Sequence, residues 1–187
     1  MKRLFLSVVL LACLSPIANA EIEKLANVCE SGVCFNWWPK LSVIEGWHQD
    51  KEQSFSMLAN AQAPSGFTFS NAETVIYAIA LYKPREPDLK TLQQLIDNDI
   101  NKFKTDYKGV DIKEVKSIDS SDGKLFKSLI FIPRESGNWE QVSYAEEGDF
   151  YLIFTISSRS KKGFDNSIGV YKRFINTYKA SSSLSDK

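Results

Sequence analysis

The single histidine of this chain, His48, limits the chemistry that the sequence could perform. A serine or cysteine hydrolase would need it as the general base of a triad. It lies in the run Gly46-Trp47-His48-Gln49-Asp50, and no Gly-x-Ser-x-Gly motif, which would hold a nucleophile, occurs in the chain. We therefore expect a loop histidine beside an aromatic residue and no catalytic residues. A hydrolase that uses His48 is the less favoured alternative.

Two cysteines, Cys29 and Cys34, are separated by four residues. In an exported chain such a pair favours a disulfide, and Gly32 allows the short loop between them to turn. A redox-active cysteine pair usually has two intervening residues, whereas this pair has four. A zinc site would need two further ligands, and only His48 lies nearby. We favour a structural disulfide over these two alternatives, and we expect no bound metal or cofactor.

The acidic residues do not form a recognisable calcium motif. Asp119, Asp122 and Gly123 resemble a calcium loop, but Ser121 occupies its third position and the glycine comes one residue early. We expect an exposed turn there. Asp97 and Asp99 are assigned to the solvent face of a helix.

Three tryptophans within a short segment, Trp37, Trp38 and Trp47, are the candidate partner-binding residues. They lie outside the strongest apolar runs, and tryptophan is enriched at protein interfaces because it pairs a large apolar body with a polar edge. Packing of Trp37 and Trp38 against a sheet is an equally favoured alternative. Pro39 suits an extended arm at a sheet edge.

The first twenty residues, 1–20, have the pattern of a secretory signal peptide. Two basic residues precede an apolar run over 4–14, and the small-residue triplet Ala18-Asn19-Ala20 follows. Cleavage after Ala20 predicts a periplasmic or secreted protein. The alternative is a lipoprotein attached through Cys13, which follows Leu10-Leu11-Ala12.

Charge and hydropathy exclude several classes of partner. The 23 basic and 23 acidic residues balance, and removal of the signal segment leaves a slight acidic excess. A nucleic-acid or anionic-membrane partner would require a basic excess. No later apolar run approaches the roughly 18 residues of a membrane-spanning helix, so we expect a soluble protein.

The periodicity of apolar residues predicts an α+β fold. We expect a segment with a disulfide loop over 21–34, a single domain over 35–180 and a flexible tail over 181–187. Asp88 caps a long helix, with an apolar stripe from Leu89 to Tyr107, and Gly109 ends it. Short turns between the later strands make the sheet mostly antiparallel, with helices packed on it as an α/β/α sandwich. The expected elements are a helical turn over 21–28, strands over 35–41, 54–61, 74–82, 111–118, 125–132, 139–145 and 150–156, and helices over 88–107 and 165–178.

The order of these elements resembles the PsbP-like family of α/β/α sandwiches. The resemblance rests on Trp37-Trp38-Pro39, on Gly46-Trp47, on the long helix and meander, and on the ending Phe174-Ile175-x-x-Tyr178. It covers most of Phe35 to Tyr178, while the disulfide loop departs from the family. The family includes an extrinsic photosystem II protein and exported bacterial proteins. The resemblance implies a non-enzymatic binding or accessory domain and supplies no catalytic residues.

Together these features favour an exported, non-enzymatic domain that binds a protein partner in the bacterial periplasm. An immunity-type inhibitor of an exported toxin is a narrower form of this hypothesis. The alternative is a carrier that holds a small apolar ligand between the sheet and a helix.

Overall fold

The computed structural model describes residues 22–30 and 32–179. The predicted signal segment with Cys13 and the predicted tail over 181–187 lie outside these residues. The elements are β1 (Ile22–Cys29), β2 (Gly32–Pro39), β3 (Trp47–Gln49), α1 (Lys51–Met57), β4 (Asn60–Pro64), β5 (Thr74–Tyr82), the 3₁₀ turn η1 (Lys83–Arg85), α2 (Leu92–Asp106), β6 (Asp111–Asp119), β7 (Leu125–Ile132), β8 (Trp139–Glu147), β9 (Phe150–Ser158) and α3 (Lys161–Asn176).

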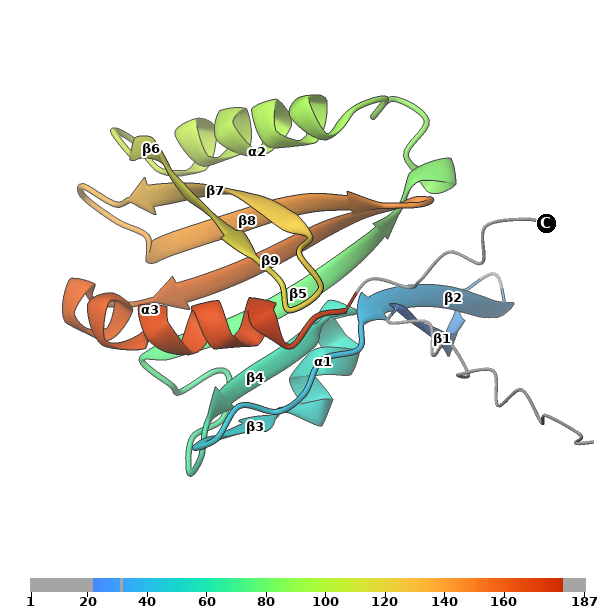
Figure 1. Cartoon of the computed structure of the whole chain (residues 1–187), viewed down its shortest axis with the longest axis horizontal. Helices are drawn as coiled ribbons and strands as arrows, with labels where there is room; N and C mark the ends of the chain where they lie inside the picture. Colours follow the sequence, from blue (N-terminus) through green and yellow to red (C-terminus); the bar gives the residue numbers. More distant parts are fainter. Residues whose placement is uncertain (1–21, 31, 180–187) are drawn as a thin grey trace, which may run out of the picture.

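Seven strands form one antiparallel sheet in the order β3-β4-β5-β9-β8-β7-β6, and β1 and β2 form a separate hairpin (Figure 1). The two strands that are apolar throughout, β5 and β9, are neighbours near the centre of the sheet, as the sequence predicts. Short turns join β6 to β7, β7 to β8 and β8 to β9. These turns account for the antiparallel order of that half.

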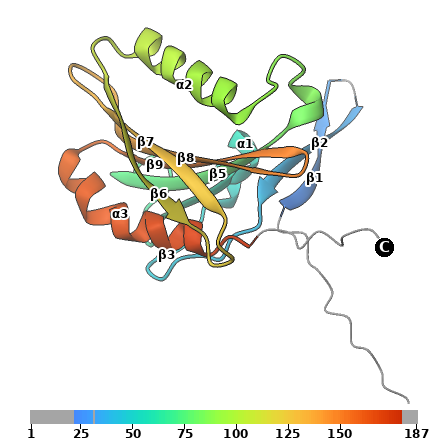
Figure 2. The same ribbon diagram turned by 45° about the horizontal axis from the view of Figure 1, so that its top comes forward.

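Helices cover both faces of the sheet. Figure 2 shows α2 and α3 on opposite faces. Met57 of α1 lines a cavity together with Ile79 and Leu81 of β5, so α1 lies over the same face as α2. Leu81 also belongs to the apolar cluster beneath α2. The fold is therefore α+β with a mostly antiparallel sheet and helices packed on it, which confirms the predicted class.

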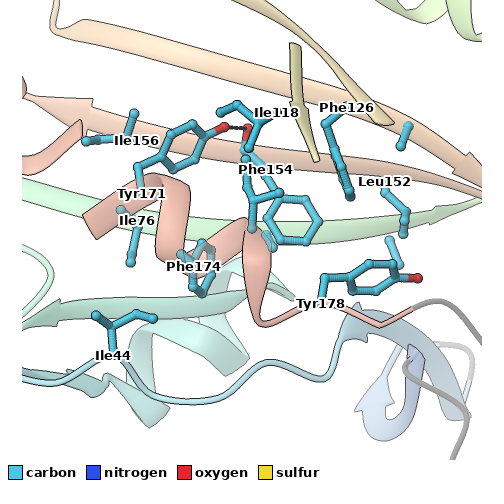
Figure 3. Packing of buried hydrophobic residues seen from close by; sticks show 14 of the residues in the cluster. Ile44, Ile76, Ile118, Phe126, Leu152, Phe154, Ile156, Tyr171, Phe174 and Tyr178 are labelled. Atoms are coloured by element: carbon cyan, nitrogen blue, oxygen red, sulfur yellow. Dashed lines mark hydrogen bonds between the residues drawn. The ribbon is translucent and has the colours of Figure 1, made fainter. Parts of the chain in front are cut away.

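The larger apolar core lies beneath α3. Phe154 of β9 meets Phe174 at 5.6 Å and Tyr178 at 5.8 Å between ring centroids (Figure 3). The hydroxyl of Tyr171, fully buried in this core, donates to the Phe154 carbonyl at 2.8 Å and lies in hydrogen-bond contact with the Ser143 hydroxyl, also at 2.8 Å. This buried hydroxyl is satisfied, so α3 is held to the sheet by polar as well as apolar contacts.

Several predicted boundaries are confirmed, but the start of α2 is not. Strands β5 and β7 have the predicted bounds. Helix α2 begins at Leu92, and its cap is Thr91 rather than Asp88: the Thr91 hydroxyl accepts from the Gln94 backbone N–H, and the Gln94 side chain accepts from the Thr91 N–H. This capping box satisfies two backbone donors that a cap at Asp88 would leave to water.

Two early elements differ from the prediction. Residues 22–29 form strand β1 rather than a helical turn, because every one of them pairs with β2. The expected strand over 54–61 is instead helix α1 followed by β4. Asp50 caps α1 through Gln53, and Leu58 ends the helix in a left-handed conformation with φ 54°. The alternation of Phe55, Met57 and Ala59 therefore does not mark a strand.

Candidate functional site

The hairpin of β1 and β2 carries most of the residues that the sequence singled out. Cys29 and Cys34 form the predicted disulfide near its turn, with Cα atoms 5.9 Å apart. Both cysteines lie on one face of the hairpin, since Cys29 pairs with Gly32 and Cys34 pairs with Asn27. Such a bond is typical of proteins of an oxidising compartment. It closes the end of the hairpin farthest from Trp38.

Trp38 anchors the base of this hairpin. Its side chain is only 4% exposed, and its ring centroid lies 5.6 Å from that of Phe55 in α1. The indole Nε1 donates to Glu23 Oε2 across the hairpin at 3.0 Å. Trp47, in β3, is half-buried against the core beneath α3. Trp38 therefore holds the hairpin to the body and offers little surface to a partner.

Trp37 points to the opposite face of β2 and is half-buried. Its ring centroid lies 4.7 Å from Tyr82 and 5.9 Å from Phe150. The Arg85 guanidinium lies 4.7 Å from the Trp37 ring and donates to the Phe35 carbonyl at 2.6 Å. Cation–π and hydrogen-bond contacts therefore fix the hairpin to the end of β5.

Three apolar side chains continue this face beyond Trp37: Val28, Val33 and Phe35, here called the hairpin stripe. They are 89%, 67% and 38% exposed. Val28 pairs with Val33, and Phe35 lies two residues further along β2, so all three share one face. Lys24 Nζ lies 4.1 Å from the Phe35 ring. The stripe is an apolar strip next to two cations, Lys24 and Arg85.

His48 lies in β3 opposite Ala63 rather than in a loop. Its Nδ1 is buried and has no hydrogen-bond partner among the described residues. Asp50, two residues later, accepts hydrogen bonds from the backbone N–H groups of Phe69 and Gln53. These bonds lower the Asp50 pKa from its ordinary value. The nearest carboxylate in sequence is therefore committed to capping α1.

A second region, here called the α2 cavity, lies between α2 and the central strands of the sheet. Its volume is about 380 Å³. Ile79, Ile153 and Tyr77 contribute from the two central strands, Glu140 from β8 and Asp99 from α2. The sequence predicts that Asp99 lies on the solvent face of its helix, and the structure corrects this. Asp99 follows Leu95 by four residues and precedes Phe103 by four, so it shares their face.

Two of the three carboxylates that line this cavity, Asp99 and Glu140, are desolvated, while the third belongs to Asp106. Glu140 accepts from Ser157 Oγ at 2.7 Å, and burial raises its pKa from 4.5 to about 6. Asp99 accepts from the Tyr144 hydroxyl at 3.0 Å, and burial raises its pKa as well. In residues 22–30 and 32–179, neither carboxylate forms an ion pair. Lys102, the cation on the cavity wall, pairs with Asp106 at 2.6 Å.

Within the described part of the chain, no group of three or more His, Cys, Asp or Glu side chains could hold a metal ion. In the same residues, no helix has the length and apolar character needed to cross a bilayer.

The comparisons with known proteins concern the fold. No family model and no curated protein matches this chain. A solution structure of cyanobacterial PsbP from Synechocystis sp. PCC 6803 is similar with a TM-score of 0.44 and 11% identity, over 91% of this chain and 98% of that one. The Ran-binding protein Mog1p of Saccharomyces cerevisiae is similar with a TM-score of 0.40 and 8% identity, over 80% of this chain and 84% of that one. The first of these structures belongs to the family that the sequence resembles, and neither similarity bears on the function of this chain.

Proposed function

We propose that this chain is an exported, non-enzymatic binding domain that docks onto a protein partner in the periplasm through its β1–β2 hairpin. The observation that supports the proposal is the hairpin stripe. Val28, Val33 and Phe35 are large apolar side chains exposed on one face of a disulfide-closed hairpin. Adjacent exposed apolar side chains of this kind mark interaction surfaces.

The construction of the hairpin favours binding as well. Trp38 and Trp37 fix its base to the body, and the disulfide closes its far end. A surface that is ordered before binding loses less conformational entropy when it docks. In this proposal the predicted tryptophans keep different roles: Trp37 extends the stripe at its inner end, while Trp38 and Trp47 support it from within.

The partner surface should be apolar at its centre and acidic at its rim. Lys24 and Arg85 flank the stripe, and complementary charges at a rim increase the rate of association and the selectivity. An immunity-type inhibitor of an exported toxin remains a narrower form of this proposal. Identification of the partner decides whether that form holds.

The structure does not favour a carrier of a wholly apolar ligand. The space between sheet and helix where such a ligand would sit is the α2 cavity. Asp99 and Glu140 lie on its walls, and an apolar ligand would bury them without an ion-pair partner or water.

The experiment compares two variants as bait in an envelope extract, with bound proteins identified by mass spectrometry. The full chain is produced with residues 1–20 present and recovered from the periplasm. In the test variant, Val28→Thr, Val33→Thr and Phe35→Thr remove the stripe. In the control, Phe67→Thr and Leu125→Thr remove apolar side chains that are 53% and 60% exposed elsewhere.

We expect a partner that the wild type and the control capture and that the test variant loses at an unchanged melting temperature. Threonine is β-branched and suits both strands of the hairpin, so the hairpin should survive. If all three proteins capture the same set, the stripe is not a docking surface. If the control loses the partner while the test variant retains it, the binding surface lies elsewhere.

A further inference from the structure

We propose that the α2 cavity is a binding site for a small organic cation, a ligand with an ammonium group on a short apolar body. No part of this cavity belongs to the hairpin stripe, so the inference is independent of the proposed docking function. It rests on the shape of the cavity, on the charges of its walls and on the aromatic rings around it.

The shape suits a small molecule. The volume of about 380 Å³ lies in the range of sites for small ligands. Ile79, Val142 and Ile153 from three adjacent strands provide apolar contacts on the sheet side. Helix α2 forms the opposite wall with Phe103. A short aliphatic chain would therefore replace water on apolar surface from both sides.

The charges of the cavity walls favour a positively charged ligand. Asp99 and Glu140 approach the cavity from α2 and β8. Each accepts from a hydroxyl, and neither forms an ion pair among the described residues, although the charge of Lys102 acts on Asp99 from a longer distance. Lys102 and Asp106 neutralise each other, so the remaining charge of the wall is negative. A desolvated carboxylate is costly unless it is paired. An ammonium group would supply the missing positive charge and would donate hydrogen bonds to a carboxylate oxygen.

The aromatic residues favour an organic cation in the same place. Tyr77, Phe103 and Tyr107 all line the cavity, and the negative face of such rings attracts ammonium groups. Gly137 leaves room for the Tyr107 ring, because a Cβ at residue 137 would lie 2.9 Å from it. A bare metal ion fits less well, because the described residues offer no group of three ligating side chains. The combination of rings, apolar surface and carboxylates matches an alkylammonium.

The probes are three small molecules of similar size and different charge: n-butylammonium, n-butanol and n-butyrate. Each is titrated at pH 7.5 into the ¹⁵N-labelled full-length protein, and amide chemical shifts are followed by NMR. We expect n-butylammonium to shift the amides of Tyr77, Val142 and Thr155 in a saturable way. We expect n-butanol to bind roughly ten-fold more weakly, since it lacks the charge, and butyrate not to bind.

Two matched variants test whether the Glu140 carboxylate contributes to binding. Glu140→Gln should weaken n-butylammonium binding roughly ten-fold, because it removes the charge and keeps the shape. Glu135→Gln, an exposed residue that does not line the cavity, should leave binding unchanged. The amide spectrum of Glu140→Gln confirms its fold independently of binding.

Three results would overturn the inference. The first is the absence of saturable shifts with n-butylammonium. The second is equal binding of n-butanol, which would make the cavity merely apolar. The third is unchanged affinity in the folded Glu140→Gln variant, or an equal loss in Glu135→Gln.

Discussion

Phe35 and Trp38, three positions apart on one strand, have opposite environments. Phe35 is 38% exposed in the hairpin stripe, while Trp38 is 4% exposed against α1. Successive side chains of a strand point to opposite faces, so an odd spacing separates the two. The sequence showed an aromatic arm but could not assign its faces, because that assignment depends on contacts with Phe55 and Tyr82, which are distant in the chain.

Substitutions on the two faces of β2 should therefore have different effects on stability. Trp38→Ala removes a buried indole and its hydrogen bond to Glu23, and should lower the free energy of unfolding by about 3–5 kcal/mol. Val33→Ala, at an exposed position, should change it by about 0.5 kcal/mol or less. Urea denaturation followed by tryptophan fluorescence and circular dichroism measures both. A small effect of Trp38→Ala would mean that the hairpin does not pack on α1.

Secondary structure could be predicted best where the local pattern and the tertiary structure agree. Strands β5 and β7 are long apolar runs bounded by turn residues, and both have the predicted bounds. The local pattern gave a wrong prediction at α1, where a strand was expected. Phe55 is 54% exposed there and so does not belong to an apolar face. The prediction of a helical turn at β1 was also wrong, because this segment is a strand that pairs with β2.

The sequence does not predict the α2 cavity, because charged residues are expected on the protein surface. A charged residue such as Asp99 is expected at the solvent face, although its spacing from Leu95 places it on the buried stripe of α2. That spacing was a usable signal. Glu140 and Tyr77 gave no comparable signal, since their proximity to Asp99 depends on the order of strands in the sheet.

Helix α3 offers a test of how closely an element approaches the sheet. It contains two glycines. A Cβ at Gly163 would lie 2.6 Å from Ser158 Oγ and 2.8 Å from Thr74 Oγ1, whereas at Gly169 the nearest atom is 3.9 Å away. Gly163→Ala should destabilise the protein by about 1–3 kcal/mol, because the N-terminal turn of α3 must move away from β5 and β9.

Gly169→Ala is the matched control for this prediction. Alanine has the higher helix propensity and meets only an ordinary van der Waals contact with Arg173 there, so it should stabilise the protein by about 0.5–1 kcal/mol. Thermal unfolding of both variants measures the pair. Equal effects at the two positions would show that α3 does not approach the sheet as closely as described.

At the scale of the whole molecule, the two faces of the sheet are covered differently. Beneath α3 the core is continuous and dominated by aromatic and aliphatic side chains. On the other face, α1 and α2 leave the α2 cavity over the central strands, with ionisable groups on its walls. The stability of the molecule should therefore respond to pH through that face.

The raised pKa of Glu140 determines whether stability increases or decreases with pH. Burial raises its pKa from 4.5 to about 6, so folding favours the protonated form. The resulting stabilisation is present below pH 4.5 and is lost as the pH rises through about 6. At 1.36 kcal/mol per pKa unit, the loss is about 2 kcal/mol. Glu140→Gln stays neutral and can still accept from Ser157, so it should be more stable than the wild type by about 2 kcal/mol above pH 7 and equal to it below pH 4.5.

The measurement is the difference in the free energy of unfolding between the two proteins from pH 4 to pH 8, by chemical denaturation at constant ionic strength. Charged neighbours such as Asp99, Lys102 and Asp106 are present in both proteins, so most of their own titration cancels in the difference. A difference that is the same at every pH would mean that water reaches Glu140 freely and that its pKa is ordinary. The α2 cavity would then lack the desolvated carboxylate that selects a cation, and a neutral ligand would suit it equally well.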